Sequence, residues 1–160
     1  MLKFLLFIFS FVVTLIVPLI TSSTTTCQNN SLACCAGYAS SASRSTTIYL
    51  INLGDEEITY DSAYLNHGKW TPDCSAVGVD PVLNSNAVAF ASGSDSHFGG
   101  TGGLATFMIG DSYLSIGWEN PYVGENLFTV SISEKFTNET ISYGWKDMVY
   151  IVIIRNKSTE

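Results

Sequence analysis

The chain has 160 residues, of which 46% are hydrophobic and 13% are charged, and its formal net charge is −7 at pH 7. An acidic chain is repelled by phosphate backbones, so the composition argues against nucleic acid as a partner. The same charge excludes a general electrostatic attraction to anionic lipid, so any membrane contact must be apolar or specific.

The first element is an apolar segment, residues 4–20, which follows Lys3 and precedes the small hydroxyl residues 21–23. This order is typical of a secretory signal peptide, and we place the cleavage near Ser23. A retained membrane anchor is the alternative, because the segment reaches the lower limit of a bilayer span, roughly 17–25 residues. Removal of residues 1–23 leaves about 137 residues, which suits a single domain.

Residues 24–45 are rich in Ser, Thr, Ala and Cys, and we expect them to form an irregular lead-in. Four cysteines follow the signal segment, and an even number in an exported chain predicts two disulfides. A bond between the neighbours Cys34 and Cys35 would close a strained ring. We therefore expect one of them to pair with Cys27 and the other with Cys74.

Three Asn-x-Ser/Thr sequons, at Asn29, Asn138 and Asn156, are relevant if the chain is exported. In a eukaryotic secretory pathway these asparagines are candidates for glycosylation at an extracellular surface. No Cys-x-x-Cys pair occurs, and neither histidine lies at ligand spacing from a cysteine, so the sequence predicts no metal site. The predicted localisation is secreted.

From residue 46 to residue 156 the sequence consists of short runs rich in Val, Ile, Tyr, Phe and Thr, separated by Gly, Asn, Asp and Pro. This pattern predicts strands. The expected strands are residues 46–53, 57–70 (bent near its middle), 86–92, 103–109, 112–118, 126–133, 140–144 and 147–155. About eight regularly spaced strands predict an all-β fold, which we interpret as an antiparallel β-sandwich, with a barrel as the alternative.

Alternation within these runs indicates which faces are buried. Leu114, Ile116 and Trp118 share one face of their strand, so that face belongs to the core. Residues 148–154 are apolar on both faces, which favours a central strand covered on both sides. Residues 109–112 predict a hairpin turn, because glycine and aspartate at its centre tolerate the required backbone angles.

No catalytic motif is found. The two histidines are His67 and His97, and the cluster Asp95, Ser96 and His97 contains the residue types of a triad. Triad members normally come from separate loops, so we interpret this cluster as a polar turn. The glycine-rich residues 99–103 precede a strand and no helix, which argues against a dinucleotide site and favours a tight turn. The sequence predicts neither an enzyme nor a cofactor.

The aromatic residues are more informative. Trp70, Trp118, Tyr122 and Trp145 lie at or beside predicted turns, and amphipathic rings favour the membrane interface. The alternative for Trp118 is core packing, which its alternation with Leu114 favours. These four residues are the candidate lipid-binding site.

Two segments carry a family resemblance. Residues 97–109 (HFGGTGGLATFMI) and 112–126 (SYLSIGWENPYVGEN) resemble the central block of the aegerolysins, small acidic β-sandwich proteins. The second segment ends in a turn motif formed by Trp118, Glu119, Asn120, Pro121, Tyr122, Gly124 and Asn126. Upstream, Gly68, Lys69 and Trp70 resemble the end of the second strand of that family, and the similarity covers residues 46–155.

The resemblance implies a protein that recognises membrane lipid, in that family often sphingolipid, and often permeabilises membranes with a larger pore-forming partner. We therefore predict a secreted, non-enzymatic toxin or defence protein. The alternative function is a secreted carbohydrate- or protein-binding module on the same scaffold. The actinoporins share a similar sandwich and are the alternative family, but they open pores with an amphipathic N-terminal helix, and residues 24–45 show no such pattern.

Overall fold

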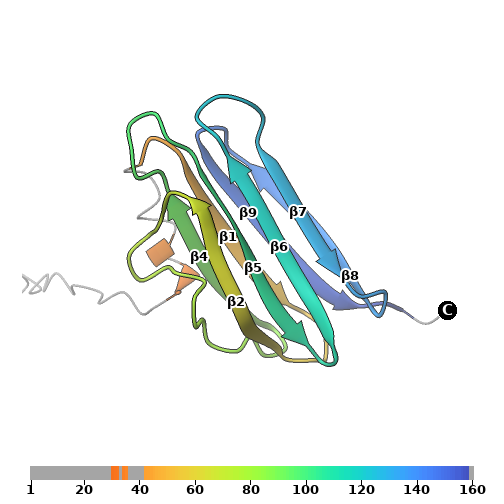
Figure 1. The fold of residues 1–160 in the computed structure, drawn as a ribbon. Coiled ribbons are helices and arrows are strands. Elements are labelled where there is room, and N and C mark those ends of the chain that lie inside the picture. The colour runs from red at the N-terminus through yellow and green to blue at the C-terminus, as the bar shows by residue number, and fades with distance from the viewer. Residues whose placement is uncertain (1–29, 33, 36–41, 159–160) are drawn as a thin grey trace, which may run out of the picture.

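The structure is a computed structural model that describes residues 30–32, 34–35 and 42–158 (Figure 1). The predicted signal peptide and its cleavage site, together with Cys27 and Asn29, lie outside the described residues. The strands of the described chain are β1 (Ser45–Asn52), β2 (Ile58–His67), β3 (Lys69–Trp70), β4 (Asn86–Gly93), β5 (Thr101–Ile109), β6 (Ser112–Asn120), β7 (Leu127–Ile132), β8 (Phe136–Tyr143) and β9 (Asp147–Asn156). Within the described ranges, no helix is long and apolar enough to cross a bilayer.

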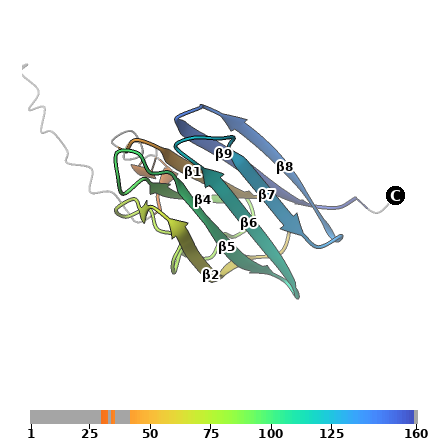
Figure 2. The same ribbon diagram turned by 45° about the horizontal axis from the view of Figure 1, so that its top comes forward.

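The strands form two sheets that lie face to face (Figures 1 and 2). The five-stranded sheet has the order β3-β4-β1-β9-β8, and the four-stranded sheet has the order β2-β5-β6-β7. Strands β1 and β9 pair in parallel, and the other pairs of the described chain are antiparallel. The predicted all-β sandwich is confirmed, with one parallel pair in its larger sheet.

The expected strand over residues 57–70 divides at Gly68. The φ angle of Gly68 is 86°, in the region that glycine adopts without a steric penalty. Before it, β2 belongs to the four-stranded sheet, and after it, β3 pairs with β4 in the five-stranded sheet. The predicted bend is therefore a crossing between the sheets, and it produces nine strands where the sequence predicts eight.

The core lies between the sheets and consists of alternate residues of the strands. Leu114, Ile116 and Trp118 of β6 are all buried, as their alternation predicts. Phe90 of β4 and Phe107 of β5 are fully buried, and their ring centroids lie 6.1 Å apart. These contacts join the two sheets, because β4 and β5 belong to opposite layers.

Strand β9 lies between β1 and β8, so its predicted central position is confirmed. Its inner residues are buried, whereas the outer residues Val149, Ile151 and Ile153 are half-buried. The prediction that both faces are covered therefore holds fully for the inner face and in part for the outer face.

Another part of the outer surface is covered by the lead-in. Cys35 and Cys74 form a disulfide, which confirms that one of the neighbouring cysteines pairs with Cys74. Both cysteines are buried against Ala89 and Ala91 of β4. The bond therefore fastens the lead-in to the outer face of the five-stranded sheet. Cys27, the partner expected for the other neighbour, lies outside the described residues.

The predicted hairpin is confirmed, because Ile109 pairs with Ser112 and Gly110 has a φ angle of 54°. The tight turn predicted over residues 99–103 is shorter than expected, because β5 begins at Thr101 and not at Gly103, and Gly102 therefore lies within the strand. A Cβ on Gly103 would lie 2.9 Å from the Trp118 ring, and one on Gly102 would collide with the Glu119 carboxylate. Gly102 therefore makes room for a side chain of β6, and Gly103 makes room for the backbone of β2 as well as for the Trp118 ring.

Candidate functional site

Several loops meet at one end of the sandwich, the upper end in Figure 1. Strands β4, β6 and β8 end there, and β1, β5, β7 and β9 begin there, as their registers require. The loops at this end are residues 94–100, 121–126 and 144–146, together with the last part of the lead-in, residues 42–44.

These loops expose a cluster of apolar side chains, which we call the aromatic rim: Phe98, Tyr122, Val123 and Trp145. Phe98, Val123 and Trp145 are 78%, 83% and 76% exposed, and Tyr122 is 39% exposed. The rings of Phe98 and Tyr122 pack edge to face, with centroids 5.4 Å apart. Large apolar side chains exposed together on adjacent loops are typical of a surface that contacts a partner or a membrane.

Arg44 of the lead-in joins two loops of the aromatic rim. Its guanidinium carbon lies 5.6 Å from the ring centroid of Tyr122 and 5.1 Å from that of Trp145, which is cation–π distance. The same group donates hydrogen bonds to the backbone oxygens of Tyr122 (2.8 Å) and Trp145 (3.4 Å). One planar group therefore fixes both loops and both rings.

The turn motif supplies further links. The side-chain amide of Asn120 is buried and donates to the backbone oxygens of Ser45 (2.7 Å) and Lys146 (3.0 Å). The amide of Asn126 donates to the backbone oxygen of Trp145 (3.3 Å). Gly124 has a φ angle of 117°, which a glycine adopts without a steric penalty. The motif therefore shapes the loop between β6 and β7 and ties it to its neighbours.

The four predicted lipid-binding residues occupy two different environments. Tyr122 and Trp145 lie together in the aromatic rim. Trp118 is 3% exposed and donates from Nε1 to the hydroxyl oxygen of Ser92 (3.0 Å), and Trp70 packs against it with ring centroids 5.8 Å apart. The ring of Trp118 points inward because it shares the inner face of β6, so its position is that of a core residue.

Three residues of this site were not predicted from the sequence: Arg44, Phe98 and Val123. Phe98 and Val123 each stand as an apolar residue within a glycine-containing turn, and that contrast is a signal that could have found them. Arg44 carries no comparable signal, because its contacts lie 78 and 101 residues away in the chain.

A second feature lies on the outer face of the four-stranded sheet. Tyr64, Leu104, Gly117 and Thr129 stand opposite one another in a single row across β2, β5, β6 and β7. Because Gly117 lacks a side chain, the row contains a depression of about 270 Å³, which we call the sheet groove. Its lining is completed by Asn66, Gly103, Trp118, Glu119, Leu127 and Phe128.

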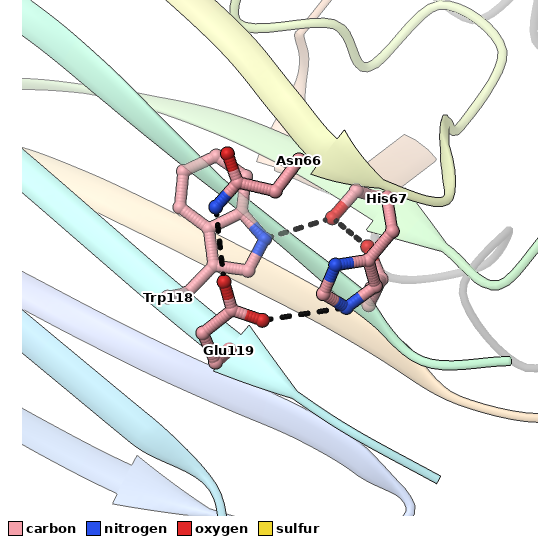
Figure 3. Close-up of polar contacts among 6 residues, drawn as sticks. Asn66, His67, Trp118 and Glu119 are labelled. Carbon is pink, nitrogen blue, oxygen red and sulfur yellow. Dashed lines mark hydrogen bonds and ion pairs between the residues drawn. The ribbon is translucent and has the colours of Figure 1, made fainter.

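The polar end of the sheet groove is ordered by mutual contacts (Figure 3). Asn66 donates from Nδ2 to one carboxylate oxygen of Glu119 (3.0 Å), and Nε2 of His67 lies 3.3 Å from the other. Asn66 is the extra residue of a bulge in β2, and such bulges redirect side chains. Glu119 lies across Gly102, which leaves room for its carboxylate.

The remaining predicted residues lie in a loop or on the exposed surface of strands. Asp95, Ser96 and His97 lie in the loop between β4 and β5, as expected of a polar turn. In the described part of the chain, no cluster of His, Cys, Asp or Glu could hold a metal ion. Asn138 and Asn156 are exposed, and their glycosylation stays a prediction.

No family model matches the chain, and no curated protein sequence matches it. The fold does have a relative among solved structures. It is similar to the crystal structure of a lipid binding protein named Nakanori, with a TM-score of 0.63 and 11% sequence identity. The match covers 78% of this chain and 76% of that chain. At this identity the similarity shows a shared fold.

Proposed function

We propose that this chain is a secreted, non-enzymatic protein that binds membrane lipid through the aromatic rim. The observation that carries the proposal is that Phe98, Tyr122 and Trp145 are exposed together, and that Arg44 ties the two loops that carry Tyr122 and Trp145. The similarity of the fold to a lipid binding protein supports it. Trp118, which is buried in the core, and Trp70, which is half-buried against it, lie outside the aromatic rim.

Burial of exposed rings in the interface supplies the free energy of binding. A fully buried Phe-sized side chain contributes roughly 1.5–3 kcal/mol. Because Arg44 already orders the loops, little conformational entropy is lost on binding. Since the chain is acidic overall, we expect the binding to depend weakly on salt and on anionic lipid.

The narrower proposals concern lipid choice and biological role. We propose sphingolipid-containing membranes as the target, and a toxin or defence role in which a larger partner protein forms the pore. We also propose that the chain is a member of the aegerolysins. The turn motif supports this membership, because Asn120, Tyr122, Gly124 and Asn126 all help to build the loop that carries part of the aromatic rim.

Co-sedimentation of the secreted protein with vesicles tests the proposal. The vesicles contain phosphatidylcholine alone, phosphatidylcholine with sphingomyelin, or phosphatidylcholine with phosphatidylserine. We expect binding that is strongest with sphingomyelin, and loss of that binding in the double variant Phe98→Ala, Trp145→Ala.

Tyr113→Ala is the matched control, because Tyr113 is 58% exposed and lies near the start of β6, at the opposite end of the sandwich. It removes an exposed ring without touching the aromatic rim. An absence of binding to every vesicle, or equal binding by the double variant and the unmodified protein, would contradict the proposal.

A further inference from the structure

We propose that the sheet groove binds one neutral hexose ring of a glycan. This site lies on the outer face of the four-stranded sheet and is formed by residues other than those of the aromatic rim. The proposal rests on its shape, on one exposed aromatic ring and on an ordered set of polar groups, and it does not depend on lipid binding.

The shape of the sheet groove suits a flat ring. Gly117 forms the floor, between Leu104 and Thr129 of the neighbouring strands. A Cβ at Gly117 would lie 2.8 Å from the Thr129 hydroxyl oxygen, so glycine keeps this floor open. The volume of about 270 Å³ lies just below the range of roughly 300–1,000 Å³ typical of sites for drug-sized ligands. The space therefore fits a single ring.

The walls of the sheet groove are apolar. Tyr64 is 55% exposed and Leu127 is 59% exposed, and Leu104 lies between Tyr64 and the glycine floor. An exposed phenol ring offers an apolar face beside a polar hydroxyl. One face of a hexose presents C–H groups, and that face can pack on Tyr64 while the hydroxyl groups point toward the polar end.

The polar end offers donors and acceptors together. The Glu119 carboxylate has about four lone-pair directions, and its contacts with Asn66 and His67 occupy two of them. The amide oxygen of Asn66 and the hydroxyl of Thr129 add further hydrogen-bonding capacity. Sugar hydroxyls both donate and accept, so they match this mixture.

The same groups disfavour ionic ligands. An anion such as phosphate would lie against the Glu119 carboxylate on a chain with a net charge of −7. A cation would find one carboxylate, that of Glu119, among the lining residues of the sheet groove, and each of its oxygens already has a contact with Asn66 or His67. A neutral polyhydroxylated ring meets neither difficulty.

The sugar could be carried by a glycolipid or by a soluble glycan, since the sheet groove lies close to the aromatic rim. Glu119 directly precedes the last residue of β6, and Leu127 begins β7. The loop between these two strands carries Tyr122 and Val123 of the aromatic rim. A glycolipid headgroup could therefore reach the sheet groove while the rim contacts the membrane.

Ligand-observed NMR with a panel of free methyl hexopyranosides tests the proposal in the absence of any membrane. We expect saturable binding of at least one hexoside, weakened about tenfold or more by Tyr64→Ala or by Glu119→Gln. Tyr64→Phe keeps the ring and should retain binding, and Tyr113→Ala is the control for removal of an unrelated exposed ring. Thermal unfolding of each variant confirms that it is folded.

Failure of every hexoside to bind would overturn the proposal, as would binding that Tyr64→Ala and Glu119→Gln leave unchanged. Because no vesicle is present, either result leaves the lipid proposal standing. Loss of vesicle binding in Tyr64→Ala, without any hexoside binding, would assign the sheet groove to lipid instead. For a confirmed hexoside, vesicles with and without a hexosylceramide distinguish a glycolipid source from a soluble one.

Discussion

Arg44 is the residue on which the geometry of the aromatic rim depends. It is a single side chain from the lead-in, and it contacts the rings and backbone oxygens of both Tyr122 and Trp145. Loops are usually the most mobile parts of a fold, so a fixed arrangement of exposed rings requires ties of this kind. The planar, multiply donating guanidinium is suited to this task, whereas an ammonium group is not.

At the residue scale we predict that Arg44→Ala weakens vesicle binding about tenfold, because the loops must then be ordered when the protein binds. Arg44→Lys should weaken vesicle binding almost as much, since an ammonium group cannot bridge both carbonyl groups and both rings. Vesicle titration measures both effects.

Arg155→Ala is the charge-matched control for this experiment. Arg155 pairs with Glu139 at 3.0 Å on the surface of β8 and β9, away from the aromatic rim. If Arg155→Ala weakens binding as much as Arg44→Ala does, the effect comes from net charge, and the tie that we assign to Arg44 is wrong.

The crossing from β2 to β3 is the decisive feature at the scale of elements. It carries Trp70 from one sheet to the other, where its ring packs against Trp118. The crossing depends on Gly68, whose positive φ angle turns the chain in a single residue. A Cβ at this position would lie 2.7 Å from the backbone oxygen of Gly93, so the sheets leave no room for a side chain.

We predict that Gly68→Ala lowers the free energy of unfolding by more than the roughly 1–2 kcal/mol that a positive φ angle alone costs. The excess comes from the clash with Gly93. Gly78→Ala is the matched control, because Gly78 has a φ angle of 70° and a Cβ at this position would have no other atom within 4 Å. Urea unfolding measures the free energy of unfolding of both variants. Equal losses in the two would show that the close approach of residue 68 to the Gly93 backbone does not contribute.

At the scale of the whole molecule, the buried Tyr150 and the half-buried Tyr49 link stability to pH. Burial raises the pKa of Tyr150, which stacks on Phe128 with ring centroids 3.8 Å apart. Burial, and to a smaller extent Tyr143, raises the pKa of Tyr49. The folded protein therefore holds these phenolic protons more tightly than the unfolded chain does.

The resulting stability is fully present below the unfolded pKa of about 10 and is lost as pH rises through the higher folded pKa. We predict that the free energy of unfolding falls above about pH 10. Tyr150→Phe keeps an aromatic ring that cannot ionise and should make the fall shallower, whereas Tyr113→Phe, at an exposed site, should not. Denaturant unfolding over a pH series measures this, and identical slopes in all three proteins would contradict the assignment.

Much of the fold could be predicted from the sequence, because strand periodicity is a local property. The inner face of β6, the hairpin after Ile109 and the central place of β9 all follow from patterns a few residues long. The candidate site was predicted only in part. Tyr122 and Trp145 are in the aromatic rim, whereas Trp118 lies in the core, where its alternation with Leu114 already favoured placing it.

By itself, the sequence determined the all-β class, the buried faces and the pairing of a lead-in cysteine with Cys74, since each depends on side-chain chemistry close along the chain or on the exclusion of a strained bond. Only the tertiary structure decided that residues 57–70 cross between the sheets, that Gly102 makes room for a carboxylate, and that Arg44 joins distant loops. These features depend on what lies beside each residue in space. Contacts between residues far apart in the chain produce no periodic pattern in the sequence.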